Sequence, residues 1–270
     1  MNQPHITFVG AGNMATSLAG GLIQQGTAAN QITLCDINPE ALERAAQTLG
    51  VLTSQDAQAA CAHADVVVIA VKPQVVASVV PALKTAIATR NALVISIVAG
   101  TPLSRFADWL GSAAVVRCMP NTPALVGLGA TGLWANPQVS TEQRDLAQRI
   151  LSAVGCAVWL ESEAQIDAIT ALSGSGPAYY FLVMEAMISA GIALGLPAPI
   201  ARQMTLQTAL GAAQMAIQSD VEPDELRRRV TSPGGTTQAA LERLEQGELR
   251  KLFADALTAA CERSRELARS

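Results

Sequence analysis

The sequence predicts an α/β domain followed by an all-α domain. Up to about residue 160, short β-branched runs alternate with Ala-rich helical stretches, and this alternation builds a parallel sheet with helices on both faces. After GCAVWL at 155–160 the strand-like runs stop, and helical patterns continue to the end of the chain. We therefore place the domain boundary near Ser162, between an α/β domain at 1–162 and a helical domain at 163–270.

The strands of the α/β domain are expected at short apolar runs. The run VVVIAV at 66–71 shows no polar alternation, as expected for a central strand that is buried on both faces. The helix at 39–50 has Pro39 near its start and Gly50 at its end, which is the usual asymmetry. The expected strands are HITFVG, ITLCDI, VLTS, VVVIAV and LVISIV, with AVVRCMP and TGLWA extending the sheet.

The helical half suits a protein that associates with itself. The stretch 177–196 is nearly long enough to cross a bilayer, but Glu185 lies in its middle, and a charge at mid-membrane is costly. We therefore expect a buried or dimer-interface helix without membrane association, in a homodimer or an assembly of dimers. The expected helices are 163–194, 198–218, 224–230, 236–246 and 248–268.

Composition excludes several other classes of protein. Lys and Arg number 18 against 22 Asp and Glu, so no basic stripe is expected to bind nucleic acid. The first strand begins almost at Met1, which leaves no room for a signal peptide. Five widely spaced cysteines without a C-x-x-C pair argue against disulfides or a metal site and favour a cytoplasmic location: Cys35, Cys61, Cys118, Cys156 and Cys261.

A glycine motif, GAGNMA at 10–15, directly follows the first strand and opens a helix. Gly10 permits the tight turn, Gly12 lets a pyrophosphate approach the backbone, and Ala15 is small enough for the helix to pack on the strand. The helix N-terminus would present unpaired N–H groups to the phosphates. An ordinary glycine turn is the alternative, but the strand, the helix and a second strand ending in an acid favour a Rossmann-type dinucleotide site.

Asp36 ends that second strand. A carboxylate there accepts hydrogen bonds from both ribose hydroxyls and repels a 2′-phosphate. The nearest following arginine, Arg44, lies inside the next helix, so the pattern favours NADH over NADPH. The alternative is that Asp36 caps the helix after Asn38 and Pro39.

Three further segments end strands on the same rim, where ligands of such folds bind. Lys72, one of only three lysines, follows VVVIAV, although an ordinary surface lysine is the alternative. Ala99 ends LVISIV, and Asn121 lies between two prolines in a loop rigid enough to aim backbone groups at a nicotinamide. A simple connection between strands is the alternative for that loop.

Two loops stand out in the helical half. The string LSGSGPAY at 172–179 must break or kink a helix, because it holds two glycines and a proline. The string TSPGGTT at 231–237 is a Gly-rich turn into a helix, where backbone N–H groups and threonine hydroxyls form an anion site. Either loop taken singly is better explained as a simple helix connection.

Together, these strings resemble one enzyme family. GAGNMA, AVKPQ, RCMPNTPALVG, LSGSGPAYYF and VTSPGGTTQAALERLE occur in the order and spacing of pyrroline-5-carboxylate reductases. The resemblance runs from the first strand to the final helices, and the last two strings are the more specific. It implies a Rossmann domain, a helical dimerisation and substrate domain, and reduction of 1-pyrroline-5-carboxylate to L-proline by NADPH or NADH, the last step of proline biosynthesis.

The resemblance also implies site residues. Members that prefer NADPH often have a small hydroxyl residue where this chain has Asp36. The catalytic candidates are Thr237, Ser175 and Lys72. The cofactor candidates are Gly10, Ala11, Gly12, Asn13, Met14, Ala15, Asp36, Ala70, Val71, Lys72, Pro73, Ala99 and Asn121. The substrate candidates are Ser175, Gly176, Ser232, Gly234, Gly235, Thr236 and Thr237. No role is assigned to Asp220 or Arg229.

The expected chemistry requires orientation more than acid–base catalysis, because a protonated imine accepts hydride directly. The two histidines, His5 and His63, are not placed like the catalytic histidine of a 2-hydroxy-acid dehydrogenase. A 3-hydroxyacid dehydrogenase is the nearest enzyme alternative, but the long helix after Tyr179 lacks the lysine such enzymes use. A nucleotide-sensing protein is the non-enzyme alternative, and it would not need both glycine loops.

Overall fold

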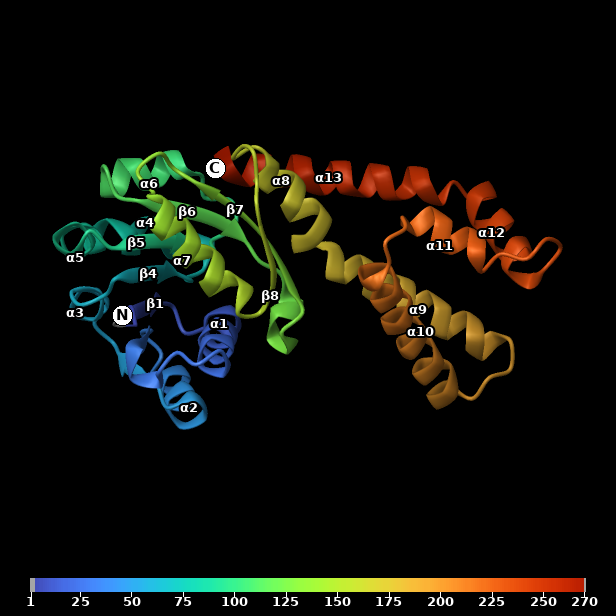
Figure 1. Ribbon diagram of the computed structural model, residues 1–270, viewed down its shortest axis with the longest axis horizontal. Helices are drawn as coiled ribbons and strands as arrows, with labels where there is room; N and C mark the ends of the chain where they lie inside the picture. Colours follow the sequence, from blue (N-terminus) through green and yellow to red (C-terminus); the bar gives the residue numbers. More distant parts are fainter. Residues whose placement is uncertain (1–2, 270) are drawn as a thin grey trace. The chain divides into compact units, whose positions relative to one another are not determined.

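The computed structural model describes residues 3–269, which form two compact units (Figure 1). Of the described residues, the first unit comprises 3–175 together with 260–269, and the second comprises 176–259. The first holds a β-sheet with its covering helices, and the second is helical throughout. The α/β domain followed by an all-α domain is therefore confirmed.

An eight-stranded sheet in the order β3-β2-β1-β4-β5-β6-β7-β8 forms the centre of the first unit. The β4 strand lies in the middle of the sheet and is fully buried, as its unbroken apolar run predicts. The strands are β1 Ile6–Val9, β2 Ile32–Cys35, β3 Leu52–Ser54, β4 Val66–Ile69, β5 Leu93–Ser96, β6 Val115–Met119, β7 Gly129–Ala135 and β8 Gly155–Trp159.

Helices cover both faces of this sheet, and each face has its own apolar core. Helices α1, α2 and α7 bury residues such as Leu18 and Ile150 on one face, whereas α3 to α6 bury residues such as Phe106 on the other. The helices are α1 Asn13–Gln24, α2 Pro39–Leu49, α3 Ala57–Cys61, α4 Pro73–Val79, α5 Lys84–Arg90, α6 Leu103–Leu110, α7 Thr141–Ser152 and α8 Gln165–Ile169, with short 3-10 turns η1 Ala29–Gln31, η2 Val80–Leu83 and η3 Thr122–Val126.

The sheet is not parallel throughout. All neighbouring strands are parallel except β6 and β7, which pair antiparallel with Cys118 opposite Leu133. The physical reason is the connection between them, a short loop at 120–128 built around η3. A parallel pair needs a crossover of a dozen or more residues, whereas an antiparallel pair is joined by a short turn.

The junction between the units differs from the expected boundary at Ser162. The chain leaves the first unit only after Ser175, because α8 packs on the sheet, where the Ile169 side chain lies against Gly132. The expected helix at 163–194 is also not continuous, since a π-helical turn, η4 Thr170–Gly174, separates α8 from α9. The glycines of this segment therefore produce a π-helical turn, in which the Ser175 N–H donates to the Thr170 carbonyl at 2.8 Å.

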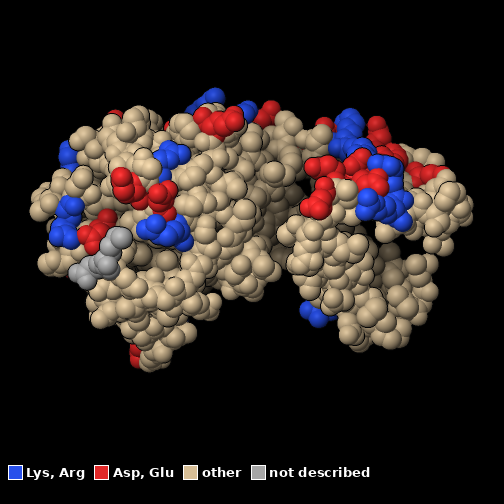
Figure 2. Space-filling view, in the orientation of Figure 1, with Lys and Arg blue, Asp and Glu red and all other residues tan. Residues whose placement is uncertain are grey.

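The second unit exposes much apolar surface. It contains α9 Gly176–Ala193, α10 Ala198–Gln218, α11 Pro223–Arg229, α12 Thr236–Gln246 and the first part of α13 Leu249–Arg269. Helices α9 and α10 pack on each other, yet Gly176 is the only buried residue of α9. Leu182 is 66% exposed and Leu210 is 55% exposed. In Figure 2 charged side chains gather over α11 and α12, whereas α9 and α10 show few.

This surface needs a partner, because monomeric proteins rarely expose such large apolar patches. Within residues 3–269, no helix combines the length and the apolar character that a bilayer crossing requires. A second copy of the chain is the partner that the sequence predicts, with the apolar sides of α9 and α10 buried between subunits.

We expect light scattering at micromolar concentration to give a mass of at least twice 28.0 kDa. Leu182→Glu in α9 should shift the protein towards monomer, because a carboxylate would have to be buried in the interface. The matched control is Leu52→Glu, at a 48% exposed leucine of β3 in the other unit, which should leave the mass unchanged. A stable wild-type monomer would contradict this expectation.

Candidate functional site

The glycine loop after β1 lies against the carboxyl end of β4. Gly10 has a φ of +108°, and its N–H donates to the Cys35 carbonyl of β2 at 2.7 Å. A Cβ at this position would stand 2.5 Å from the Ala70 carbonyl oxygen, which real atoms do not tolerate. Only glycine therefore fits, for two independent reasons: the left-handed backbone and the close approach to β4.

Gly12 has a different role, because a Cβ there would meet no protein atom within 4 Å. It occupies the N-cap position of α1 with an ordinary φ of −74°, and no side chain caps the helix. Gly12 and Asn13 are exposed, so the first N–H groups of α1 face open space. Ala15, at 1% exposure, packs the helix on the sheet. This geometry suits an anion such as a pyrophosphate.

Asp36 braces this loop from the end of β2. One carboxylate oxygen accepts the Ala11 N–H at 2.8 Å, and the other accepts the Asn38 N–H at 2.9 Å. The N-cap of α2 is Asn38, whose side chain accepts the Glu40 N–H, so Asp36 does not cap this helix. Each oxygen of Asp36 keeps a second lone pair that can accept a hydroxyl proton.

Arg44 lies closer to the glycine loop than the sequence indicates. A hollow of about 330 Å³ between α1 and α2 is lined by Arg44 together with Ala11 and Asn13 of the loop. The guanidinium is mostly exposed, and its ion pair with Glu40 is long, at 3.9 Å. Helical geometry explains why sequence reading missed it, because a residue inside a helix can face the N-terminus of a neighbouring helix.

The other rim candidates follow strands at the same edge of the sheet. Ala70 follows β4, and its N–H donates to the Val9 carbonyl at 2.8 Å. Lys72 is exposed at the N-cap position of α4, and Ala99 is exposed beyond β5. Asn121, 9% exposed, donates to the Ser173 carbonyl and accepts the Ala130 N–H. Because both ends of the side-chain amide are occupied by these hydrogen bonds, only the backbone groups of Asn121 are available to contact a cofactor.

Ser175 and Gly176 lie at the end of the π-helical turn. The Gly174 backbone approaches Met119 so closely that a Cβ would stand 2.7 Å from the Met119 methyl carbon. Gly174 thus packs this turn against the end of β6. Gly176 is buried as the first residue of α9, and the hydroxyl of Ser175, half-buried, forms no hydrogen bond within residues 3–269.

In the second unit, the glycine-rich turn forms the N-terminus of α12. Gly234 has a φ of +71°, and its N–H donates to the Gln238 side chain at 2.7 Å. The Gly235 N–H donates to the Ser232 carbonyl at 3.0 Å, so both glycine N–H groups already have partners. The expected anion site is thereby reduced to the exposed start of α12, at Thr236 and Thr237.

The Thr237 hydroxyl has no local partner. No side chain caps α12, and among the hydrogen bonds of residues 3–269 none involves this hydroxyl. Other threonines at or near helix starts, such as Thr16 and Thr170, donate to a carbonyl of their own chain segment. Thr237 therefore does not act as a helix-start residue that makes a local backbone hydrogen bond through its side chain.

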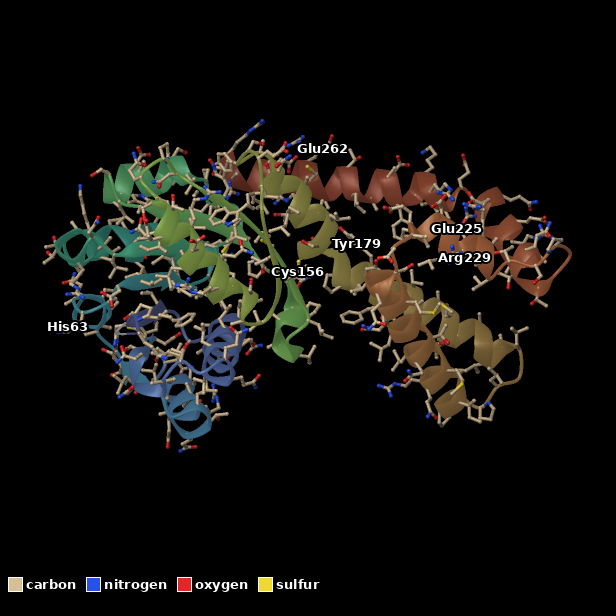
Figure 3. The ribbon with its side chains drawn as sticks, viewed as in Figure 1. His63, Cys156, Tyr179, Glu225, Arg229 and Glu262 are labelled. Atoms are coloured by element: carbon tan, nitrogen blue, oxygen red, sulfur yellow. The ribbon has the colours of Figure 1, made fainter. Side chains whose placement is uncertain are left out.

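No imidazole lies near the glycine loop. His5 precedes β1, and His63, which is labelled in Figure 3, precedes β4, so both residues lie at the amino edge of the sheet, opposite the loop. Burial lowers the pKa of His5, partly offset by Asp65, and the ring bonds the Thr33 hydroxyl at 2.9 Å. Burial also raises the pKa of Cys35 to about 11 and that of Cys61 to about 12, so neither thiol serves as a nucleophile.

A doubly wound sheet, a glycine loop under an uncapped helix and a following helical unit define a nicotinamide-dependent oxidoreductase. Residues 5–100 match the family model described as NADP oxidoreductase, coenzyme F420-dependent. Residues 163–267 match the model for pyrroline-5-carboxylate reductase dimerisation.

Full-length relatives identify the family. A pyrroline-5-carboxylate reductase of Pseudomonas aeruginosa is 53% identical, with 99% of this chain and 98% of the relative covered. The structure of the enzyme from Coxiella burnetii is 46% identical with a TM-score of 0.96, and each chain is covered completely. A Plasmodium falciparum pyrroline carboxylate reductase with NADP bound is 29% identical, with a TM-score of 0.87 and 99% of each chain covered. This chain belongs to the pyrroline-5-carboxylate reductase family, uses NAD(P)H and associates with itself.

Alanine substitutions at Gly10 and Gly12 should separate effects on the stability of the fold from effects on cofactor affinity. Gly10→Ala should lower the free energy of unfolding by more than about 2 kcal/mol, because it combines backbone strain with a clash. Gly12→Ala should cost less than about 1 kcal/mol as a poorer N-cap. It should nevertheless raise the cofactor dissociation constant about tenfold, because the new Cβ occupies the space left for phosphate.

Thermal unfolding and fluorescence titration with NADH and NADPH measure the two effects. Gly20→Ala, at an α1 position where a Cβ would meet only the flexible Leu49 side chain at 3.5 Å, is the matched control. Unchanged cofactor binding in Gly12→Ala would remove this loop from the pyrophosphate site.

Proposed function

We propose that this chain performs the reaction of its family, the reduction of 1-pyrroline-5-carboxylate to L-proline, with the cofactor at the glycine loop of the first unit and the substrate at the glycine-rich turn of the second. The observation that carries this assignment is the pair of uncapped helix starts with glycine in the N-cap position, at Gly12 and Gly235. Helix N-termini of this kind bind anions, and each reactant carries one: the cofactor has a pyrophosphate and the substrate has a carboxylate.

On the cofactor side, Gly10 gives the loop its shape, and the N–H groups of Gly12, Asn13 and Met14 bind the pyrophosphate. Ala11 is held in place by its bond to Asp36, and Ala15 seats the helix on the sheet. The nicotinamide would be held by the rim formed by Ala70, Val71, Lys72, Pro73, Ala99 and the backbone of Asn121. Exposure of Lys72 and Ala99 at the carboxyl edge of the sheet supports this placement.

On the substrate side, the carboxylate binds at the start of α12. The N–H groups of Thr236 and Thr237 point outward there, supported by the turn of Ser232, Gly234 and Gly235. The Thr237 hydroxyl orients the ring nitrogen. Ser175 and Gly176 complete the substrate contacts from the π-helical turn.

The chemistry follows from a protonated imine. Hydride adds to the carbon of the C=N bond, and the π electrons become the lone pair of the ring nitrogen, so no further proton is needed in that step. The nicotinamide supplies the hydride when it is bound. The tasks left to this chain are to hold both reactants in line and to exclude other orientations, which agrees with the position of both histidines at the far edge of the sheet.

Cofactor preference is set by the balance between Asp36 and Arg44. Asp36 places a carboxylate beside the glycine loop, which disfavours a 2′-phosphate and favours NADH. Arg44 lines the hollow next to the same loop, which gives a phosphate one possible cation. We expect Asp36 to have the larger effect on cofactor preference, because its carboxylate is fixed by two hydrogen bonds, whereas the Arg44 side chain is 69% exposed.

We also propose the cytoplasm as the compartment of the enzyme. All five cysteines are present as free thiols, three of them buried, as is typical of a reducing environment. Cell fractionation with a tagged chain tests this assignment, and recovery in a secreted or membrane fraction would contradict it.

Asp36→Ser should raise the preference for NADPH over NADH more than about tenfold, because one repulsion and one charge-assisted bond are lost together. The measurement is the ratio of kcat/KM values for the two cofactors. The matched control is Asp56→Ser, because Asp56 also binds two backbone N–H groups but caps α3. If both cofactors lose efficiency equally in Asp36→Ser, Asp36 only braces the loop.

Thr237→Ala should lower kcat/KM for the pyrroline about tenfold or more, because a hydrogen bond and the alignment of the ring are lost together. Cofactor affinity should remain unchanged, and Thr237→Ser should retain most of the activity. The control is Thr258→Ala, which removes a hydroxyl that donates to the Ala254 carbonyl on α13. Wild-type efficiency in Thr237→Ala would exclude this residue from the site.

A further inference from the structure

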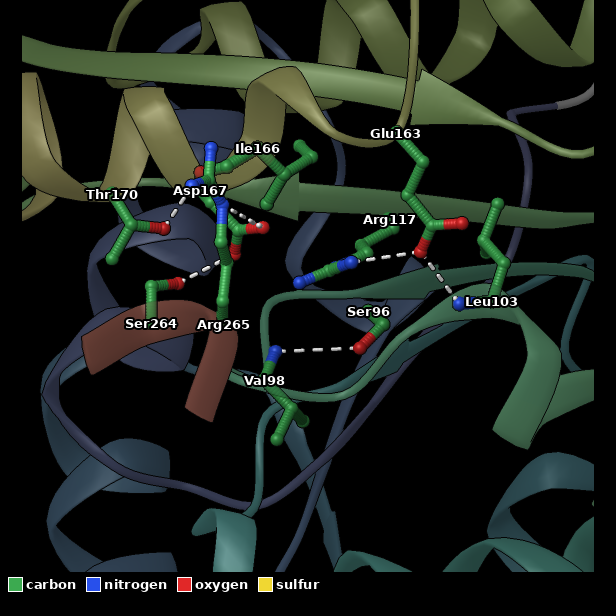
Figure 4. A network of polar contacts seen from close by, with 10 residues as sticks. All are labelled: Ser96, Val98, Leu103, Arg117, Glu163, Ile166, Asp167, Thr170, Ser264 and Arg265. Carbon is green, nitrogen blue, oxygen red and sulfur yellow. Dashed lines mark hydrogen bonds and ion pairs between the residues drawn. The ribbon is translucent and has the colours of Figure 1, made fainter. Parts of the chain in front are cut away.

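A buried charged residue lies inside the sheet, within the otherwise apolar run AVVRCMP at 114–120. Arg117 belongs to β6, and its side chain is 5% exposed. Its Nη1 donates to Glu163 Oε1 at 2.7 Å, and the Glu163 side chain is 31% exposed (Figure 4). A buried ion pair stabilises a fold little more than an apolar pair of the same size, but it fixes the direction of both side chains.

The same oxygen of Glu163 has a second donor. Oε1 also accepts the N–H of Leu103, the first residue of α6, at 2.7 Å. Pro102, in the N-cap position of α6, has no side chain that can accept this bond, so Glu163 supplies the missing cap from a distant segment. Arg117 therefore holds Glu163, and Glu163 holds the start of α6.

The segment that precedes α6 is the loop 97–102, which contains Ala99 of the proposed nicotinamide rim. Its first residues are held by the sheet, because the Ile97 N–H donates to the Ile69 carbonyl at 3.1 Å and the Val98 N–H donates to the Ser96 hydroxyl at 3.3 Å. Its last residues are held by Glu163 through Leu103. Ala99 itself is exposed between these two anchors.

The C-terminal end of α13 packs against this loop. Gly100 has a φ of +72°, and a Cβ there would stand 3.4 Å from the Leu267 Cβ, so the two backbones lie close together. The Ser264 hydroxyl donates to Asp167 at 2.7 Å, which fastens the end of α13 to α8, the helix that follows Glu163. These contacts all lie within the first unit.

We propose that Arg117 and Glu163 are positioning residues for the nicotinamide end of the cofactor, acting through the loop 97–102. The ion pair fixes the far anchor of the loop, and the end of α13 limits its outward movement. Neither side chain needs to touch the cofactor. The inference rests on the proposed place of Ala99 beside the nicotinamide, and it deepens the proposed function.

The test compares Glu163→Ala, Glu163→Gln and Arg117→Met in the full-length protein. Fluorescence titration gives the dissociation constants of NADH and NADPH, and steady-state kinetics give KM for cofactor and for pyrroline separately. Glu163→Ala should raise the dissociation constant and KM of the cofactor about fivefold or more. KM for the pyrroline at saturating cofactor should stay within about twofold. Glu163→Gln keeps an acceptor for the Leu103 N–H. On a logarithmic scale, its cofactor dissociation constant should therefore rise by no more than half as much as that of Glu163→Ala.

The matched control is Glu266→Ala, which breaks an exposed ion pair with Arg263 near the end of α13 in the same unit. It should leave all of these constants unchanged. A lower melting temperature with unchanged cofactor binding in Glu163→Ala would mean that the ion pair is only structural and would overturn the proposal. If Glu163→Ala does not fold, Glu163→Gln and Arg117→Met decide by the same criterion, because either must weaken cofactor binding more than Glu266→Ala does.

Failure of this proposal and failure of the proposed function give different results. A wild-type protein that binds NADH or NADPH but does not oxidise it with the pyrroline would refute the reaction and leave the titration of the Glu163 variants valid. A wild-type protein that turns over the pyrroline, with variants that bind cofactor normally, would refute only the role of Arg117 and Glu163.

Discussion

The nucleotide half of this enzyme depends on one close approach, that of the Gly10 backbone to the Ala70 carbonyl. The space between them does not admit a Cβ, so the chain after β1 must turn across the end of β4 at this point. That turn sets where α1 begins and thus where its unpaired N–H groups point. Asp36 secures the arrangement through the Ala11 N–H, which ties the end of β2 to the glycine loop.

The two units bury their apolar surface in different ways. The sheet of the first unit has a separate apolar core on each face, so it is covered by its own helices. In the second unit, α9 and α10 are largely apolar without a distinct polar face, and Leu194, just after α9, is 87% exposed. Because such a surface is costly in water, self-association is part of the fold of this unit rather than an addition to it.

The proposed site needs little acid–base machinery for hydride transfer. It consists of two uncapped helix starts and a threonine hydroxyl without a local partner. In our proposal these groups orient the reactants, and orientation alone accounts for a large share of the rate enhancement of many enzymes. Orienting the reactants then requires rigid supporting loops. This requirement agrees with the observation that the Asn121 side chain and the Arg117–Glu163 pair form hydrogen bonds that hold backbone segments in place.

The sequence by itself determined the features that depend on neighbouring residues. Apolar runs marked the strands, glycines and prolines marked the turns, and the motif at 10–15 marked the glycine loop between β1 and α1, because periodicity and backbone preference act over a few residues. Tertiary structure decided the features that depend on distant partners. These include the antiparallel β7, the partners of Asp36, the pairing of Glu163 with Arg117 across 46 residues and that of Ser264 with Asp167 across 97. The run AVVRCMP contains a lone arginine, but only the folded topology shows that it is buried and that Glu163 is its partner.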